Sequence, residues 1–433
     1  MLHKAQTNRI AWVLNDFIAF AVLYILGLAY RLRVKLSAGK KIKDRAIIFG
    51  SDPILNNKYW SEALRSAGMN SKTVVDTFYS INSREDFDEV CRRGHTPLKD
   101  IRAWITLYRS IRDADWIVMP FSGYFFGKSP FAYKMAGLFR LFHTKVMIIP
   151  YGSDVWVYRR LRSLNRQFGL MASYPGAARR QREISKRLDY WTDNADAILP
   201  GPLSAEGIGR WTVLTPSVLC IDTDVWKPEK PKVNQVEKVR IIHTPNHRGY
   251  KGTEYVKAAV AQLQTEGYSV ELRLLEGVPN DDVKRILCGE TDILVEQLLS
   301  GYGLSAVEGM AAGVVVIANL EETHRSKFLD RHTYFRECPI VSATPENITD
   351  VLRELVENAE LRSELSALSR EYASRYHSYE FFASLFSRVC FEPNEPEGAL
   401  ETLFDPVCGE RRAPAPLQIP LEGHLLKRNG VGR

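Results

Sequence analysis

Residues 300–318 read Ser300-Gly-Tyr-Gly-Leu-Ser-Ala-Val-Glu308-Gly-Met-Ala-Ala-Gly313-Val-Val-Val-Ile-Ala318 and predict a loop, a short helix and a buried strand, in that order. The two glycines of the loop allow the backbone to approach another group closely. We expect a helix from Leu304 to Ala312, ended by Gly313, and a strand in the apolar run that follows. Because a helix N-terminus carries free N–H groups and a positive dipole end, this one predicts an anion site, most often for phosphate.

Glu308 lies about one and a half turns into this helix, where an acid suits sugar hydroxyls better than phosphate. The segment resembles the donor-site signature of retaining glycosyltransferases of family 4, which have the GT-B fold. In that family a Glu, seven residues and a second Glu precede Met-Ala-x-Gly. Here Glu308 is the second Glu, and Ser300 stands where the family's sugar-binding Glu is expected. Glu296 is the nearby acid that is available to substitute for it.

Two other interpretations fit the same stretch. Gly301-x-Gly303-x-x-Ala306, with Glu321 about 20 residues further on, matches a loose dinucleotide-binding fingerprint. A Gly-rich turn between core elements, without a ligand, is the simplest alternative.

A second segment favours the diphosphate site. Val239–His243 is an expected strand, residues 244–253 an expected loop, and a helix is expected to follow through Gln264. Arg248 and Lys251 lie three apart in that loop, at the carboxyl end of a strand, where open α/β sheets bind ligands. Two fixed cations can clamp a diphosphate, and the loop resembles the one that binds the donor diphosphate in family 4. The alternative is two solvated surface cations. A hydride-transfer enzyme would not need the pair.

The whole chain has the composition of a two-domain globular protein. Its 433 residues are 45% hydrophobic and 25% charged, enough for two ordinary cores. The net charge of +7 favours anionic partners, and no nucleic-acid recognition motif accompanies it. The six cysteines show no CxxC pair and no cluster with histidines, so we expect reduced thiols and no metal site.

Apolar runs alternate with helical segments along the body of the chain, which predicts parallel sheets with helices on both faces. The polar, Pro-interrupted stretch 227–238 is the expected interdomain linker. The predicted division is a hydrophobic helix with a basic flank (1–45), a Rossmann-like acceptor domain (46–226), the linker (227–238), a Rossmann-like donor domain (239–376), a helix returning to the first domain (377–392) and a Pro- and Gly-rich tail (393–433).

The stretch from Ile10 to Tyr30 is apolar and long enough to cross a bilayer, and a run of Arg and Lys follows it up to Arg45. It also contains Asp16, and a central Asp costs about 3 kcal/mol on insertion scales. Two interpretations remain open: a single span or re-entrant anchor, and a helix docked on the globular body. The cations after the stretch predict a body on the cytoplasmic face of the membrane, attached through residues 10–45 to anionic lipid.

The first half of the chain supplies the expected acceptor side. Tyr151-Gly152-Ser153-Asp154 ends an expected strand, in the place where family members often carry His-Gly-x-x, and Ser51-Asp52 follows the first strand. Asp154 is either a catalytic acid that meets the acceptor hydroxyl or a turn residue. An expected helix from Ala177 to Asn194 is either solvated on its basic face or in contact with a lipid diphosphate. Its cations are Arg179, Arg180, Arg182, Lys186 and Arg187.

The resemblance therefore implies a metal-independent retaining glycosyltransferase without a cofactor, which transfers sugar from a nucleotide diphosphate sugar to an acceptor hydroxyl. A lipid-linked intermediate of surface polysaccharide or glycan synthesis is the expected acceptor. Three alternatives stay open: a nucleotide-sugar epimerase of the same fold, a non-catalytic scaffold and, least favoured, a nucleic-acid binder. The residues expected to act in catalysis are Arg248, Lys251, Glu308 and Asp154, and those expected to bind the donor are Asn246, Gly252, Thr253, Glu296, Ser300, Gly301, Tyr302, Gly303, Leu304 and Ser305.

Overall fold

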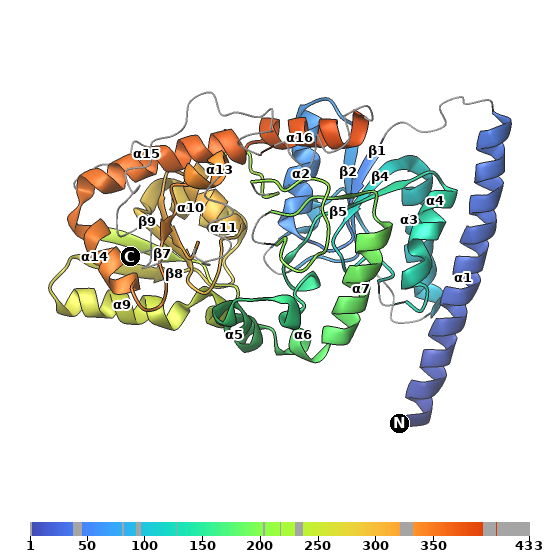
Figure 1. The fold of residues 1–433 in the computed structure, drawn as a ribbon, viewed down its shortest axis with the longest axis horizontal. Helices are drawn as coiled ribbons and strands as arrows, with labels where there is room; N and C mark the ends of the chain where they lie inside the picture. The colour runs from blue at the N-terminus through green and yellow to red at the C-terminus, as the bar shows by residue number, and fades with distance from the viewer. Residues whose placement is uncertain are drawn as a thin grey trace.

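The computed structural model describes residues 2–37, 46–79, 82–91, 97–127, 129–201, 204–216, 218–229, 237–320, 332–392 and 404. They form two α/β domains side by side, with a long N-terminal helix along the outer edge of the first domain (Figure 1). Part of the predicted linker, residues 321–331 (which include Glu321) and nearly all of the predicted tail lie outside the described residues.

The N-terminal sheet is parallel throughout, in the order β3-β2-β1-β4-β5-β6. Its strands are short and almost wholly buried, as expected of a parallel sheet covered on both faces. The strand order reverses between β1 and β4, and the loops after these two strands open at this switch point. The strands are β1 Ala46–Phe49, β2 Ser71–Val75, β3 Glu89–Val90, β4 Ala114–Met119, β5 Lys145–Ile148 and β6 Ala197–Ile198. The helices are α2 Leu55–Ser66, α3 Pro97–Asp113, α4 Met135–Leu141, α5 Leu164–Ser173, α6 Pro175–Arg179 and α7 Gln181–Asn194.

The C-terminal sheet is also parallel, in the order β11-β10-β9-β7-β8, and its switch point lies between β7 and β9. The elements that follow these two strands, α8 and α11, therefore flank the switch point. The strands are β7 Val239–His243, β8 Val270–Leu274, β9 Ile293–Gln297, β10 Val315–Ala318 and β11 Val341–Ser342. The helices are α8 Arg248–Lys251, α9 Thr253–Thr265, α10 Asn280–Glu290, α11 Leu304–Ala311, α13 Thr333–Arg336, α14 Ile348–Glu357, α15 Ala359–Tyr376 and α16 Tyr379–Phe391.

Two local predictions need correction. The expected helix from Ala177 to Asn194 is two helices, because Arg180 leaves the helical conformation between α6 and α7. The expected loop after β7 contains a helical turn, α8, which ends at Gly252 in the left-handed region (φ 76°). A side chain at Gly252 would also approach Leu298 to 3.0 Å, so both backbone conformation and space favour glycine here.

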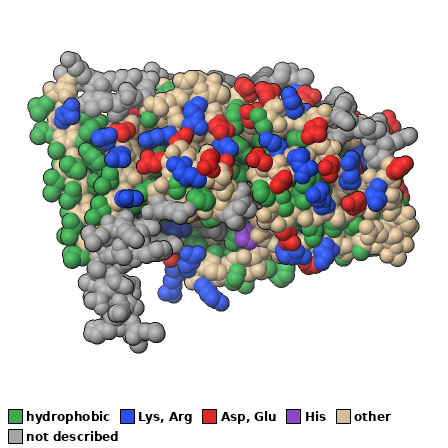
Figure 2. Space-filling model, turned by 180° about the vertical axis from the view of Figure 1, so that it is seen from behind, with side chains coloured by type: hydrophobic (Ala, Val, Ile, Leu, Met, Phe, Trp, Pro, Cys, Tyr) green, Lys and Arg blue, Asp and Glu red, His purple; other side chains and the backbone are tan. Residues whose placement is uncertain are grey.

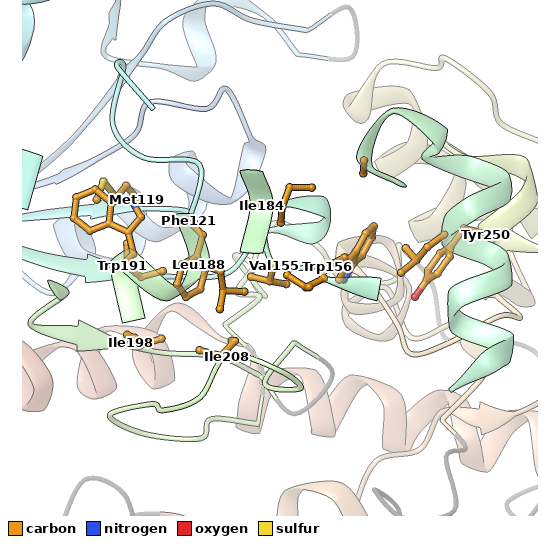
Figure 3. Packing of buried hydrophobic residues seen from close by; sticks show 14 of the residues in the cluster. Met119, Phe121, Val155, Trp156, Ile184, Leu188, Trp191, Ile198, Ile208 and Tyr250 are labelled. Atoms are coloured by element: carbon orange, nitrogen blue, oxygen red, sulfur yellow. The ribbon is translucent and has the colours of Figure 1, made fainter. Parts of the chain in front are cut away.

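The two domains meet through aromatic side chains as well as polar contacts. Trp156 of the first domain stacks on Tyr250 of α8, with ring centroids 5.8 Å apart (Figure 3). The backbone N–H of Tyr250 donates to Ser173 Oγ at 2.7 Å, so α5 and α8 are held together. The C-terminal helix α16 packs on α2 of the first domain, and its Phe386 also contacts Phe49 of β1, with ring centroids 5.7 Å apart.

Helix α1, Leu2–Leu36, docks on α3 and α4 through one face, and from Val13 onward, where its side chains are described, its other face is exposed. Phe20 stacks on Phe131 at 4.8 Å, and Gly27 lies against Leu141 with no room for a side chain. Asp16 is buried in this contact and accepts a hydrogen bond from Ser129 Oγ at 2.7 Å. Its carboxylate therefore lies against protein, which corresponds to the docked-helix interpretation.

The outer face of α1 remains apolar. Figure 2 shows a band of hydrophobic side chains along this edge of the molecule. From Val13 to Leu36 the helix is long and apolar enough to cross a membrane. Among the described side chains of α1, the large exposed ones are Val13, Leu14, Phe17, Ile18, Val22, Tyr24, Ile25, Leu26, Leu28, Leu32 and Leu36.

Candidate active site

The predicted donor-side residues gather at the switch point of the C-terminal sheet. Lys251 ends α8, and its ammonium forms an ion pair with Glu296, at the end of β9. The side chains are 8% and 0% exposed, so the pair is shielded from water. Ser305, in the first turn of α11, lies 3.5 Å from Lys251 Nζ and donates to Glu296 Oε1 at 2.9 Å. The structure thus places one cation at the N-terminus of α11, where a phosphate is expected.

Glu296 also orders the loop before α11. Its second oxygen accepts the backbone N–H of Gly303 at 3.2 Å, and a side chain at Gly303 would approach this carboxylate to 3.3 Å. Glu296 therefore fixes both Lys251 and the start of the helix. That Glu296 substitutes for the family's sugar-binding Glu stays a prediction. Its described contacts are all to protein groups on the donor side.

Arg248 occupies the other end of α8 and is exposed. Its guanidinium donates to Glu276 at 2.8 and 2.9 Å and pairs with Glu254. Exposed pairs of this kind are weak and exchange readily with solvent or with a charged ligand. A diphosphate can therefore compete for Arg248 at little cost in stability.

Glu308 is buried on the α11 face that looks toward α10. Its Oε1 accepts a hydrogen bond from Asn280 Nδ2 at 2.9 Å, and Asn280 Oδ1 in turn accepts from the Tyr59 hydroxyl at 3.2 Å. Tyr59 belongs to α2, so this chain of bonds joins the two domains. Burial raises the pKa of Glu308 from 4.5 to about 7, against the opposing effects of Asn280 and Lys251. Burial therefore makes the Glu308 carboxyl a weaker acid than an ordinary glutamate.

Thr253 and Asn246 are two further residues that were predicted to bind the donor. Thr253 is buried and bonds through Oγ1 to Nε2 of His243 at 2.9 Å, while His243 Nδ1 contacts the Val295 carbonyl at 2.6 Å. Burial lowers the pKa of His243 to about 4, so its imidazole is a neutral, packed group. Asn246 is exposed in the same loop.

The loop before α11 is anchored by its backbone. The Ser300 carbonyl accepts from the Tyr250 hydroxyl at 3.1 Å, and Ser300 itself is buried. Gly301 takes a positive φ of 68° and donates to the Asn319 carbonyl at 2.5 Å. Tyr302 and Leu304 are half-buried beside it. The loop is thus fixed by main-chain contacts, which leaves the first turn of α11 to meet a ligand.

The acceptor-side residues converge on one loop, residues 120–134, which follows β4. Ser51 Oγ accepts the N–H of Phe125 at 2.7 Å, and Asp52 accepts from Ser122 Oγ at 2.7 Å. These contacts bridge the switch point of the N-terminal sheet. Farther along the same loop, Ser129 and Phe131 are the residues that contact α1. One loop therefore links the predicted acceptor side to the apolar helix.

Asp154 is buried and holds two backbone segments of the acceptor side together. Its two oxygens accept the backbone N–H groups of Phe121 and Tyr151, at 2.7 and 2.8 Å. Burial raises its pKa to about 7, although both hydrogen bonds act in the opposite direction. These contacts fit the turn interpretation, and a catalytic role stays a prediction. Tyr151 is exposed, and Gly152 takes a positive φ of 61° in the turn. Ser153 belongs to the same turn.

Within the part of the chain that the structure describes, no group of three His, Cys, Asp or Glu side chains is arranged to bind a metal. The five described cysteines, Cys91, Cys220, Cys288, Cys338 and Cys390, are buried and are not joined in disulfides.

The sequence did not point to Asn280, to Tyr59 or to the pairing of Glu276 with Arg248. Asn280 begins a helix shortly after β8, at the ligand-binding edge of the sheet, and this position is a signal that could have identified it. Tyr59 carries no such signal, because its contact to Asn280 joins residues 221 positions apart.

Comparisons with known proteins show the same fold. No family model matches the chain, and no curated protein matches it. The chain is similar to the solved structure of Anabaena Alr3699/HepE in complex with UDP, with 10% identity and a TM-score of 0.51 over 79% of this chain and 98% of that one. A glycosyltransferase from Rickettsia africae gives 10% identity and a TM-score of 0.48, over 81% and 100% of the two chains. WaaG, a glycosyltransferase involved in lipopolysaccharide biosynthesis, gives 13% and 0.42, over 79% and 99%.

At these identities the likeness concerns the fold alone. The HepE match covers nearly all of that chain, and both sheets here are parallel and doubly wound. The predicted GT-B architecture of two Rossmann-like domains is thereby confirmed.

Proposed function

We propose that the protein is a membrane-associated retaining glycosyltransferase that moves a sugar from a nucleotide diphosphate sugar to an acceptor hydroxyl. The observation that carries this proposal is the Lys251–Glu296–Ser305 cluster at the N-terminus of α11. It lies at the switch point of the second sheet, the place where doubly wound sheets bind nucleotides. The similar Anabaena structure was solved with UDP, which supports a nucleoside diphosphate as the ligand class.

The cations and the helix would stabilise the leaving diphosphate. In glycosyl transfer the bond between the sugar and the diphosphate breaks, and negative charge develops on the phosphate oxygens. Lys251, Arg248 and the free N–H groups at the start of α11 are donors prearranged for that charge. Fixed cations supply the stabilisation that a divalent metal supplies elsewhere, so no metal and no cofactor is required.

Glu308 would bind the ribose of the donor. Its carboxylate is buried behind the helix N-terminus and is already oriented by Asn280. Ribose hydroxyls donate most strongly to an ionised carboxylate, so we expect bound nucleotide to shift Glu308 toward its charged form. Ser300 stands at the family's first Glu position, which leaves the donor sugar open.

The acceptor would approach from the side of α1. The apolar outer face of this helix and the cations Arg31, Arg33 and Lys35 near its end suit an anionic membrane surface. Loop 120–134 connects this helix to Asp52 and Asp154. A lipid-linked intermediate on the cytoplasmic face, as in surface polysaccharide or glycan synthesis, fits this arrangement.

Purified full-length protein in nanodiscs, assayed with a panel of nucleotide diphosphate sugars, tests the proposal. Release of nucleoside diphosphate with transfer to an added lipid-linked acceptor is the expected result, and NMR of the product anomer tests retention. Interconversion of the sugars without an acceptor would instead identify an epimerase. Binding without turnover across the panel would favour a scaffold.

A further inference from the structure

Tyr59 is a residue of the first domain that reaches the donor side of the second. It lies in the second turn of α2, is 6% exposed, and donates through its hydroxyl to Asn280 Oδ1 at 3.2 Å. Asn280 begins α10, and its Nδ2 donates to Glu308 Oε1 at 2.9 Å. The three side chains therefore form one hydrogen-bonded chain, which crosses the boundary between the two domains from α2 to α10 and α11 (Figure 1).

The direction of this chain is fixed at Tyr59. Burial and the charge of Glu308 raise the pKa of the Tyr59 hydroxyl, and a hydrogen bond from the Trp226 side chain acts in the opposite direction. The hydroxyl therefore keeps its proton at neutral pH. Because the indole N–H of Trp226 can only donate, the hydroxyl accepts from it and has its own proton left for Asn280. The Asn280 carbonyl oxygen accepts that proton, so its amide nitrogen must face Glu308.

The orientation of Asn280 decides which form of Glu308 is favoured. Among the described residues Asn280 is the one hydrogen-bond donor to Glu308, and it contacts Oε1 alone. The other oxygen, Oε2, is therefore left to accept from a ligand. A rotated Asn280 would instead turn its carbonyl oxygen to Glu308 and favour the protonated acid, which accepts hydroxyl protons more weakly than a carboxylate does.

The same helix also holds the predicted acceptor side. Asn57, two residues before Tyr59, donates through Nδ2 to the backbone carbonyl of Asp52 at 2.7 Å. The Asp52 side chain in turn accepts from Ser122 Oγ at 2.7 Å. The beginning of α2 is therefore bonded to the acceptor-side loop at one point and, through Asn280, to the donor-side acid at another.

We propose that Tyr59 is a positioning residue of the donor site. Through Asn280 it holds the Glu308 carboxylate ready for the ribose hydroxyls, so a nucleoside diphosphate binds with full affinity only while α2 of the first domain contacts α10 of the second. Because coupling of this kind is reciprocal, bound nucleotide strengthens the same contact and thereby stabilises the acceptor-side loop. The inference rests on the proposed function, since it requires that Glu308 binds the ribose.

Calorimetric titration of the full chain tests the inference. UDP, ADP and GDP are titrated first, and the nucleotide that binds most tightly is then compared with inorganic diphosphate. Tyr59→Phe keeps the ring and removes the hydroxyl, so we expect that nucleotide to bind roughly three- to tenfold more weakly, the size of one neutral hydrogen bond. Inorganic diphosphate has no ribose and should bind both proteins equally. Tyr379→Phe, which removes a hydroxyl that donates to Glu62 of the same helix at 2.7 Å, is the matched control and should leave nucleotide affinity unchanged.

A double-mutant cycle with Glu308→Gln separates positioning from a general effect on the fold. In the Glu308→Gln background, the added Tyr59→Phe change should weaken the nucleotide by less than about twofold, because the charged acceptor that Tyr59 positions is already gone. If Tyr59→Phe fails to fold in thermal melts, Asn280→Ala breaks the same chain from α10. It must then weaken the nucleotide and leave inorganic diphosphate unchanged.

Equal nucleotide affinity in the wild type and Tyr59→Phe would overturn the inference and leave the donor site in place. Equal weakening of the nucleotide and inorganic diphosphate, or the same nucleotide loss in both backgrounds of the cycle, would make Tyr59 a structural residue and would also overturn it. Failure of the wild type to bind UDP, ADP and GDP would instead contradict the proposed function, and the inference would fall with it.

Discussion

Lys251 and Glu296 form a buried ion pair that joins α8 to the end of β9, at the switch point of the C-terminal sheet. The pair has two consequences for experiments. Removal of Lys251 alone leaves an uncompensated buried carboxylate, which typically costs about 3–5 kcal/mol of stability. A loss of activity in Lys251→Ala is therefore ambiguous, and a variant that also neutralises Glu296 is needed to separate folding from function.

A single substitution of Arg248 separates folding from function more clearly than one of Lys251. Because its pairs with Glu254 and Glu276 are exposed, Arg248→Ala should leave the melting temperature nearly unchanged. Turnover should fall by roughly two orders of magnitude, the size expected for one lost donor to a leaving group. Arg273→Ala, which breaks an exposed pair with Glu290 in the same domain, is the matched control and should change neither property. If Arg248→Ala showed wild-type kinetics, Arg248 would not be part of the active site.

Glu308→Gln should weaken nucleoside diphosphate binding by roughly one to two orders of magnitude, because Gln keeps the shape of the side chain but lacks the charged acceptor. Asn280 can still donate to the Gln carbonyl, so the fold should persist. Calorimetric titration with UDP, paired with thermal melts, measures both quantities. Unchanged affinity together with a large loss of stability would make Glu308 a structural acid.

The same variant should alter the pH dependence of stability. Glu308 has a pKa of about 7 in the folded protein and an ordinary value of 4.5, so the unfolded chain releases this proton first as pH rises. The stabilisation of the folded state by the protonated Glu308 carboxyl is fully present below pH 4.5 and is lost as pH rises to 7. Gln carries no charge, so Glu308→Gln should gain stability relative to the wild type between pH 4.5 and 7, with a constant difference above 7. If the difference in stability between Glu308→Gln and the wild type were the same at all pH values, the raised pKa of Glu308 would be contradicted.

Chelation should leave turnover unchanged within assay error. Lys251 and Arg248 supply the positive charge at the expected diphosphate position, and the described residues offer no cluster of metal ligands. Assays after dialysis against EDTA, with and without added magnesium or manganese, measure the effect. Complete loss of activity that either metal restores would refute the metal-independent mechanism.

The outer face of α1 should determine membrane binding. Ile18, Ile25 and Leu32 are spaced by seven residues on this face, and each is more than half exposed. Their combined replacement by Ser should abolish sedimentation with anionic vesicles and leave the melting temperature nearly unchanged. Phe20→Ala, on the docked face, should instead lower the melting temperature while vesicle binding persists. Continued vesicle binding by the triple variant would place the attachment elsewhere in the protein.

The sequence was sufficient to predict elements whose signals are local. The turn, helix and strand of residues 300–318 are found as predicted, with α11 over Leu304–Ala311 and β10 over Val315–Ala318. Their glycines and apolar runs specify structure within a few residues. The helical turn α8 was missed because its four residues are too few to show a period.

Contacts between distant segments could not be predicted. Asp16 pairs with Ser129 across 113 positions, and nothing near Asp16 shows that its carboxylate would be buried against protein. Likewise, Glu296 and Lys251 were both selected as donor-side residues, but only the adjacency of β7 and β9 brings them together. The strand order that creates this adjacency is a property of the folded sheet.

The turnover of nucleotide diphosphate sugar by the double variant Lys251→Ala, Glu296→Gln tests the donor-site assignment most directly. Gln keeps the shape of Glu296 and can still accept from Ser305, so this variant should melt close to the wild type. We predict release of nucleoside diphosphate at least 100-fold slower than in the wild type, the size expected for a lost contact to the leaving group. A folded double variant with wild-type turnover would contradict a donor site at the start of α11.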